Sequence, residues 1–279
     1  MRSIISSPRV LRTGQPLSLE AVRQVCPAVF AEGPHSSRGE RYRYVPTIVP
    51  LEKLLANGWG IYECSGQRSR EILRGGYTKH MLRLRKLENF SPNQVVRDGV
   101  PEVILINAHD GTSAYHLRGG YFRFVCSNGM IVGTTMAGFT VRHTVGPQTA
   151  EEVLEAGERV VTETFPKMLE NIELWRSTVI PYETQVRLAQ RAVDLRYGST
   201  LSKFPPEDLL HARRDEDKEG TLWQVLNRVQ ENIMDGGWET RSIGWGRRSQ
   251  VRPVERVSAV VAINQGLWNE ATKIAEEMA

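Results

Sequence analysis

Cysteine is scarce in this sequence: the 279 residues include only Cys26, Cys64 and Cys126. The three are far apart, odd in number and form no Cys-x-x-Cys pair, so neither a zinc knuckle nor a disulfide framework is indicated. The N-terminus lacks a long apolar segment, and no hydrophobic run reaches the roughly 18 residues that a membrane span needs. These absences predict a cytoplasmic protein that does not associate with a membrane.

Phosphate-binding loops are also missing. The chain contains no Gly-x-Gly-x-x-Gly fingerprint and no loop that ends in Gly-Lys-Ser or Gly-Lys-Thr. Folds that bind nucleotide cofactors through those loops are therefore disfavoured, and no cofactor is predicted. The histidines of the strand region match no known metal-ligand spacing, so no metal is predicted either.

The chain does have enough apolar residues to form a core. Hydrophobic residues make up 40% of the sequence, so it can fold as one large domain or as two smaller ones. The formal net charge of +4 weakly favours an anionic partner, although many proteins without such a partner are as basic.

The chain is organised around the stretch from Val103 to Val145. Its short runs alternate between apolar and polar residues, which is typical of β-strands, and glycine-containing pairs between the runs predict tight turns. Such a pattern indicates an antiparallel meander with one apolar face and one mixed, solvated face that carries Arg123 and Arg142. The turn pairs are Asp110-Gly111, Gly119-Gly120 and Asn128-Gly129.

After Gly146-Pro147 the apolar spacing becomes helical. Capping boxes begin two of the expected helices, and Pro166 predicts a kink or break within the first of them. We therefore predict an α+β fold, an antiparallel β-meander sheet followed by a helical C-terminal half. Its regions are an N-terminal segment and loop at 1–41, the sheet at 42–147, and a helical region at 148–279 packed on the sheet.

The clearest basic pattern is the predicted strand at Tyr77–Arg85. Period-two alternation places Lys79, Arg83 and Arg85 on one side of this strand, and His80 with two leucines on the other. A second basic segment, Trp238–Arg256, interleaves arginines with tryptophans.

Several motifs occur in a fixed order along the chain. They are Pro34–Ser37, Arg41-Tyr42, Val45–Thr47, Thr78–Arg83, Asn107–Ser113, Phe122–Gly129, Asn227–Asn232, Gly236-Gly237, Asn264 and Leu267-Trp268. Together they resemble a known family, the phage- and plasmid-borne proteins catalogued only as a domain of unknown function. The resemblance covers roughly Val29 to Ala275. It implies a mobile-element setting but carries no established activity and no catalytic residue.

The leading hypothesis is a nucleic-acid-binding protein of phage or plasmid DNA metabolism, with single-stranded DNA binding or annealing favoured. Strand cations neutralise phosphates, and neighbouring aromatic rings stack on bases. Annealing proteins are often rings, so a homo-oligomer is compatible with this role. The residues assigned to phosphates are Lys79, Arg83, Arg85, Arg123, Arg142, Arg247 and Arg248, and those assigned to stacking are Tyr121 and Trp245.

Two other classes stay open. His80, His109 and His116, together with Asp110, are residue types that suit a divalent metal and hence a metal-dependent nuclease. Core packing for His80 and turn chemistry for Asp110 explain the same residues without catalysis. A protein-binding module, for example an inhibitor of a host defence complex, is the second alternative. It would use Trp238, Trp245 and Trp268 as anchors.

Overall fold

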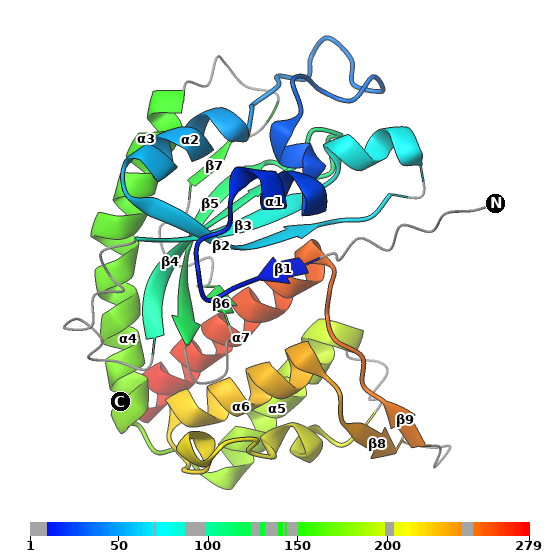
Figure 1. Cartoon of the computed structure of the whole chain (residues 1–279). Coiled ribbons are helices and arrows are strands. Elements are labelled where there is room, and N and C mark those ends of the chain that lie inside the picture. Colours follow the sequence, from blue (N-terminus) through cyan, green and yellow to red (C-terminus); the bar gives the residue numbers. More distant parts are fainter. Residues whose placement is uncertain are drawn as a thin grey trace. The chain divides into compact units, whose positions relative to one another are not determined.

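The computed structural model describes residues 10–69, 71–86, 99–123, 129–131, 139–141, 143, 150–198, 204–241 and 248–279 (Figure 1). Contacts divide the chain into two compact units. The first combines Met1–Gly129 with Ala137–Phe165, and the second combines Met130–Met136 with Pro166–Ala279. This division does not coincide with the predicted one at residue 147, because the first helix after the sheet packs against elements of the first unit.

The first unit is built on an antiparallel sheet. Every pair of its strands whose register is described runs antiparallel, so the predicted sheet is confirmed, and the helices that follow it confirm the α+β class. A short strand, β6 (Gly129–Ile131), begins at Gly129, the last residue of the segment Met1–Gly129 of the first unit. The hydrogen-bonded order is β1 (Val10–Arg12), β2 (Trp59–Gly66), β3 (His80–Lys86), β4 (Gly99–Asn107) and β5 (Tyr115–Arg123), with β7 (Phe139–Val141) paired to β5.

The register assigns side chains to two sheet faces, because residues directly opposite each other share a face. Arg83 lies opposite Ile104, which in turn lies opposite Arg118; His80 lies opposite Asn107. We call these faces the Arg83 face and the His80 face. The Arg83 face also holds Glu63, Arg85 and Glu102, and the His80 face also holds Leu82, Leu84 and Tyr121.

Helices cover the His80 face (Figure 1). Gly66, on this face, lies against Cys26 at the end of the first helix, and α2 packs on both β2 and α3. The Ser18 side chain caps the first helix by accepting a hydrogen bond from the Ala21 N–H. The elements are α1 (Leu19–Val25), η1 (Pro27–Phe30), α2 (Ile48–Ala56), η2 (Ile72–Tyr77), α3 (Ala150–Arg159) and the π-helical turn η4 (Val160–Thr164).

The π-helical turn lies directly before Pro166. Its defining bond runs from the Phe165 N–H to the Val160 carbonyl, five residues back. Proline has no N–H to donate, so a regular helical bond is missing at the next position. The helical geometry is therefore irregular where the sequence predicts a kink, and η4 is a turn of a rare type.

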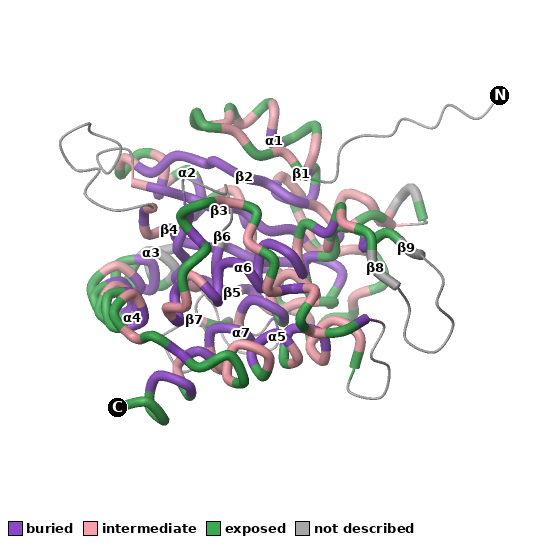
Figure 2. The backbone as a smooth tube through the Cα atoms, turned by 90° about the horizontal axis from the view of Figure 1, so that it is seen from below, coloured by how far each residue is buried: buried purple, intermediate pink, exposed green. Residues whose placement is uncertain are grey.

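Strands β2 to β5 are buried along nearly their whole length (Figure 2). Arg83 and Arg85 are each only 1% exposed. The expectation of a wet, mixed sheet face is therefore wrong for these strands. Their alternation of apolar and charged residues reflects two buried faces, one of which contains ion pairs.

Gly119-Gly120 lies inside β5, so the predicted turn at this pair is wrong. Gly119 is required by a close approach of the covering helix, because a Cβ there would lie 2.7 Å from Thr164 Cγ2. We expect Gly119→Ala to lower the free energy of unfolding by about 1–3 kcal/mol through this overlap, measured by urea denaturation. Gly75→Ala is the control, because nothing lies within 4 Å of its added methyl; equal effects would contradict the packing role.

The second unit is a helical bundle with a two-stranded sheet. The capping box of Thr221 and Gln224 begins α6 as predicted. Trp175 and Trp268 meet in its core with ring centroids 4.5 Å apart. In the described part of the chain, no helix is long and apolar enough to cross a membrane. The elements are α4 (Phe165–Ser177), α5 (Tyr182–Tyr197), η5 (Pro206–Leu210), η6 (Asp215–Asp217), α6 (Leu222–Asp235), β8 (Glu239–Arg241), β9 (Arg248–Gln250) and α7 (Val257–Met278).

Candidate functional site

The two β3 arginines that the sequence assigns to phosphates belong to a buried ion-pair network on the Arg83 face. Arg83 pairs with Glu102, and its Nε lies 3.7 Å from Glu63 Oε1. Arg85 Nε donates to Glu102 Oε2 at 3.3 Å. Glu63 and Glu102 are themselves 3% and 0% exposed. The predicted exposed stripe therefore does not exist at Arg83 and Arg85, because carboxylates inside the sheet already neutralise them.

Aromatic rings enclose the Arg85 end of this network. The Arg85 guanidinium lies 3.4 Å from the Phe122 ring centroid and 4.7 Å from the Tyr62 ring centroid. Burial alone opposes ionisation of Glu63, but Arg83 and Arg12 hold the pKa of that carboxyl below its ordinary value. The side chains of the network are therefore charged and buried, and each charge is neutralised by one of opposite sign. Removing one partner from such a network lowers the free energy of unfolding strongly, because it leaves a buried charge without compensation.

Among the residues that the structure describes, the other predicted site residues do not form one surface with these arginines. Tyr121 and Arg123 are 1% and 4% exposed and lie on the His80 face, opposite to Arg83. Lys79 is half-buried and directly precedes β3. Three predicted residues, Arg142, Trp245 and Arg247, lie outside the described residues, and so does the side chain of Arg248 at the start of β9.

A different set of residues converges where β3 begins and β4 ends. Backbone bonds join three segments there: the His35 N–H donates to the His109 carbonyl, and the His109 N–H donates to the Tyr77 carbonyl, both at 2.9 Å. Tyr42 also donates its hydroxyl to the Ala108 carbonyl at 3.0 Å. We call this place the histidine end. It comprises residues 34–47, 71–80 and 107–112 with His143.

Thr47 is at the centre of the histidine end. Its Oγ1 lies 2.9 Å from His80 Nε2 and 3.3 Å from His109 Nε2, and it accepts a bond from Asn107 Nδ2 at 3.0 Å. His80 Nδ1 faces the Thr78 carbonyl at 3.0 Å, so this nitrogen carries the proton and Nε2 accepts from the Thr47 hydroxyl. Thr47, Asn107 and both histidines are 0% exposed. The cluster is therefore an interior hydrogen-bonded scaffold.

His143 extends this scaffold toward the surface. Its Nδ1 lies 2.9 Å from the Arg43 carbonyl, and its Nε2 lies 3.1 Å from Asn107 Oδ1. The orientation of the Asn107 amide is fixed, because Oδ1 accepts from the Ala108 N–H and Nδ2 donates to the Val45 carbonyl. Both ring nitrogens thus face acceptors, which only the doubly protonated ring satisfies fully. Burial opposes that charge and lowers the pKa of His143.

The two central imidazoles are neutral at physiological pH. Burial lowers the pKa of His80 to about 4. Burial, and then the neighbouring His80 and His143, lower the pKa of His109 to about 3. The cluster therefore adds no positive charge at pH 7, and the cations of the histidine end are its arginines and Lys79.

The grouping of His80, His109, His116 and Asp110 predicted for a nuclease is only partly realised. His116 lies on the Arg83 face and contacts Thr140, away from the other two histidines. Asp110 is engaged by Thr112 and by Arg74 Nε at 3.1 Å. Among the residues that the structure describes, no three His, Cys, Asp or Glu side chains are arranged to hold a metal ion.

Arginines and aromatic rings lie around the histidine end. Arg41 and Arg43 are exposed, Arg38 lies against Gly111, and Arg74 is one-third exposed while it pairs with Asp110. Within residues 34–47 there are three arginines against one acid, Glu40. We call this set the basic rim: Arg38, Arg41, Arg43 and Arg74, with the half-buried rings of Tyr42, Tyr44 and Tyr77.

The rings are held by the histidines beneath them. Tyr42 stacks on His143 with ring centroids 4.7 Å apart and an interplanar angle of 17°. Tyr44 lies 5.0 Å from His109, and Tyr77 contacts His35 edge-on at 5.3 Å. These contacts with histidines therefore fix the positions of the three tyrosine rings next to the arginines of the same loops.

The motif at Asn227–Asn232 in the second unit has a structural role. Gln230 donates to Asn264 at 2.7 Å, Glu231 pairs with Arg214 at 2.9 Å, and Asn232 donates to two backbone carbonyls. These polar side chains of α6 are all at most 3% exposed. They join α6 to α7 and to the preceding loops.

Comparison with known proteins gives a family without an assigned activity. A domain of unknown function (DUF932) matches residues 34–268. Two proteins of Escherichia coli strain K12, the UPF0380 proteins YafZ and YfjQ, are each 34% identical over 278 residues, which is 100% of this chain and 98% of each relative. No solved structure matches the chain. The motifs that meet at the histidine end and in α6 all fall within the matched region, and the chain belongs to the DUF932 family.

Proposed function

We propose that this protein binds nucleic acid, with single-stranded DNA as the favoured ligand, through the basic rim of the histidine end. The observation that supports this most is the interleaving of arginines with tyrosines on loops that a buried, neutral scaffold holds in place. Proteins that bind single strands combine backbone-neutralising cations with rings on which bases stack. The proposed setting is cytoplasmic phage or plasmid DNA metabolism, with annealing as the activity.

The arrangement favours a single strand over a duplex for a geometric reason. The rings of the rim are half-buried and held against imidazoles, so each can present only part of its surface to a ligand. Bases of a single strand can turn toward such rings, whereas stacked bases inside a duplex cannot. The arginines alone would bind either form through phosphates.

Replacing Arg41 and Arg43 together with alanine is expected to weaken binding to a labelled single strand by roughly tenfold at low salt. The slope of log K against log salt should fall by about 0.7 for each lost phosphate contact. Both side chains are exposed, so folding should be unaffected. Fluorescence anisotropy measures both quantities.

The matched control removes two exposed cations from the second unit, as Lys167→Ala with Arg191→Ala. It changes the net charge by the same amount and should leave affinity nearly unchanged. Equal losses in both double variants would mean that only overall charge matters, and no loss in either would remove the rim from the site.

A further inference from the structure

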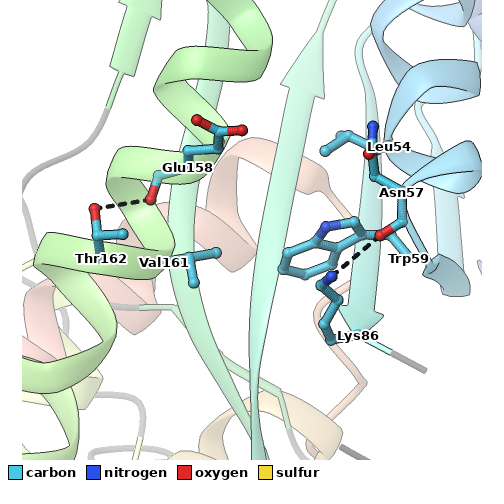
Figure 3. Close-up of a pocket in the computed structure, with 8 residues that line it drawn as sticks. Leu54, Asn57, Trp59, Lys86, Glu158, Val161 and Thr162 are labelled. Carbon is cyan, nitrogen blue, oxygen red and sulfur yellow. Dashed lines mark hydrogen bonds between the residues drawn. The ribbon is translucent and has the colours of Figure 1, made fainter. Parts of the chain in front are cut away.

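A pocket of about 320 Å³ lies in the first unit, far from the histidine end (Figure 3). Trp59 and Lys86, which are opposite each other at the ends of β2 and β3, form one wall with Leu54 of α2. Val161 of η4 faces them from the other side. Lys86 is six residues from His80 along β3, a distance of about 20 Å.

Both apolar and polar residues line the pocket, and one of the apolar ones is Trp59, which is 7% exposed. The Trp59 indole, Leu54 and Val161 line the gap between strand and helix (Figure 3). Gly157 lines it as well, and a Cβ at this position would lie 3.7 Å from Leu54 Cδ2. A methyl group at position 157 would therefore make only an ordinary contact, whereas a longer side chain would extend into the space between α3 and α2.

Two side chains of opposite charge, Lys86 and Glu158, lie at the edge of the pocket. Lys86 Nζ donates to the Asn57 carbonyl at 3.1 Å, which directs the ammonium to the pocket side of the strand (Figure 3). Glu158 lies on the helical wall opposite. The charge of an ammonium attracts an anion, and a carboxylate accepts hydrogen bonds from amino groups.

The helical wall belongs to the π-helical turn. Val161 and Thr162 are both in η4, and the Thr162 hydroxyl donates to the Glu158 carbonyl at 3.0 Å. A π turn inserts an extra residue into a helix and so changes which side chains face the neighbouring strand. Such turns are rare and are frequently found at functional sites.

We propose that this pocket takes one nucleotide, with the base against Trp59, an exocyclic amino group at Glu158 and the phosphate at Lys86. The inference rests on the proposed nucleic-acid function and adds a second contact for the same strand. A pocket near the lower limit of ligand-site volumes suits a ligand of this size. Single-strand sites of several nucleotides can include both the basic rim and this pocket.

The pocket should discriminate between bases. Glu158 is an acceptor, so adenine and cytosine, which carry amino groups, fit better than thymine, which carries none. Glu158→Gln should reduce this discrimination, because an amide both donates and accepts.

The test is titration of the full-length protein with the free mononucleotides dAMP and dTMP, followed by saturation-transfer NMR. Saturable binding with dAMP favoured is expected. Gly157→Leu should weaken it by about tenfold or more by occupying the space against Leu54. Gly157→Ala is the matched control, because its methyl makes only an ordinary contact and leaves the pocket open.

The possible results separate the two proposals. Loss of dAMP binding in Gly157→Leu alone supports the nucleotide pocket, even if the strand does not bind at the basic rim. Failure of dAMP to bind, or binding that is unchanged in Gly157→Leu, overturns it. An oligonucleotide that still binds in that case, and loses affinity in Arg41→Ala with Arg43→Ala, leaves the rim proposal standing.

Discussion

Glu102→Ala is expected to lower the free energy of unfolding by about 3–5 kcal/mol, one of the largest single-residue effects in the first unit. Glu102 is fully buried and is the shared partner of Arg83 and Arg85. Of the carboxylates that pair with these guanidinium groups in the described part of the chain, its removal leaves Glu63, which is already shared with Arg12. Urea denaturation followed by circular dichroism measures the change.

An exposed carboxylate of the same unit provides the control. Glu40→Ala removes the same charge and should change stability by no more than about 0.5 kcal/mol. If Glu102→Ala were as stable as the wild type, Arg83 and Arg85 would not depend on the network.

Lowering the pH from 7 to 5 is expected to cost about 4 kcal/mol of stability through His80 and His109. Both have a folded-state pKa below 5, about 4 and about 3, against an unfolded value of 6.5. Each histidine therefore contributes about 1.36 kcal/mol for each of the 1.5 pH units between 6.5 and 5, or about 2 kcal/mol.

The sign follows from proton binding. Between pH 6.5 and 4 the unfolded chain binds protons at these positions and the folded chain does not, so stability is fully present above pH 6.5 and falls with pH. The lowered pKa of His116 acts in the same direction. Denaturation midpoints at pH 7, 6 and 5 measure the slope. A flat profile, or imidazole resonances of His80 and His109 that titrate near 6.5, would show that the cluster is not buried.

The fold class could be read from the sequence because it depends on local periodicity. Alternating runs separated by glycine-containing turns indicate an antiparallel sheet, and the capping box at Thr221 marks a helix that exists. The turn predicted at Gly119-Gly120 is wrong because a glycine needed for close packing against Thr164 and a glycine pair needed for a turn look the same in the local sequence.

The burial of Arg83 and Arg85 could not be read from the sequence. Alternation shows that a strand has two different faces, but it does not show which of them is wet. The partners that allow the charges to be buried, Glu63 and Glu102, are on two other strands, and only the register brings them opposite.

The sequence indicates the histidine end only in part. Its motifs, including Val45–Thr47 and Asn107–Ser113, are among those by which the chain resembles a known family. What sequence alone did not show is that Thr47, Asn107 and His143 meet, because their hydrogen bonds join segments far apart in the chain. One sequence signal points to these residues: polar residues other than glycine are numerous in the motifs next to the predicted buried strands.

The measurement that tests the central claim most directly is anisotropy of labelled single-stranded and duplex DNA with the wild-type protein, at low and moderate salt, with and without Mg²⁺. The basic-rim account predicts binding to the intact single strand that is tighter than to the duplex and weakens as salt rises. Absence of binding at low salt would contradict the account and direct the search to protein partners. Cleavage of the probe that requires Mg²⁺ would contradict it in favour of a nuclease.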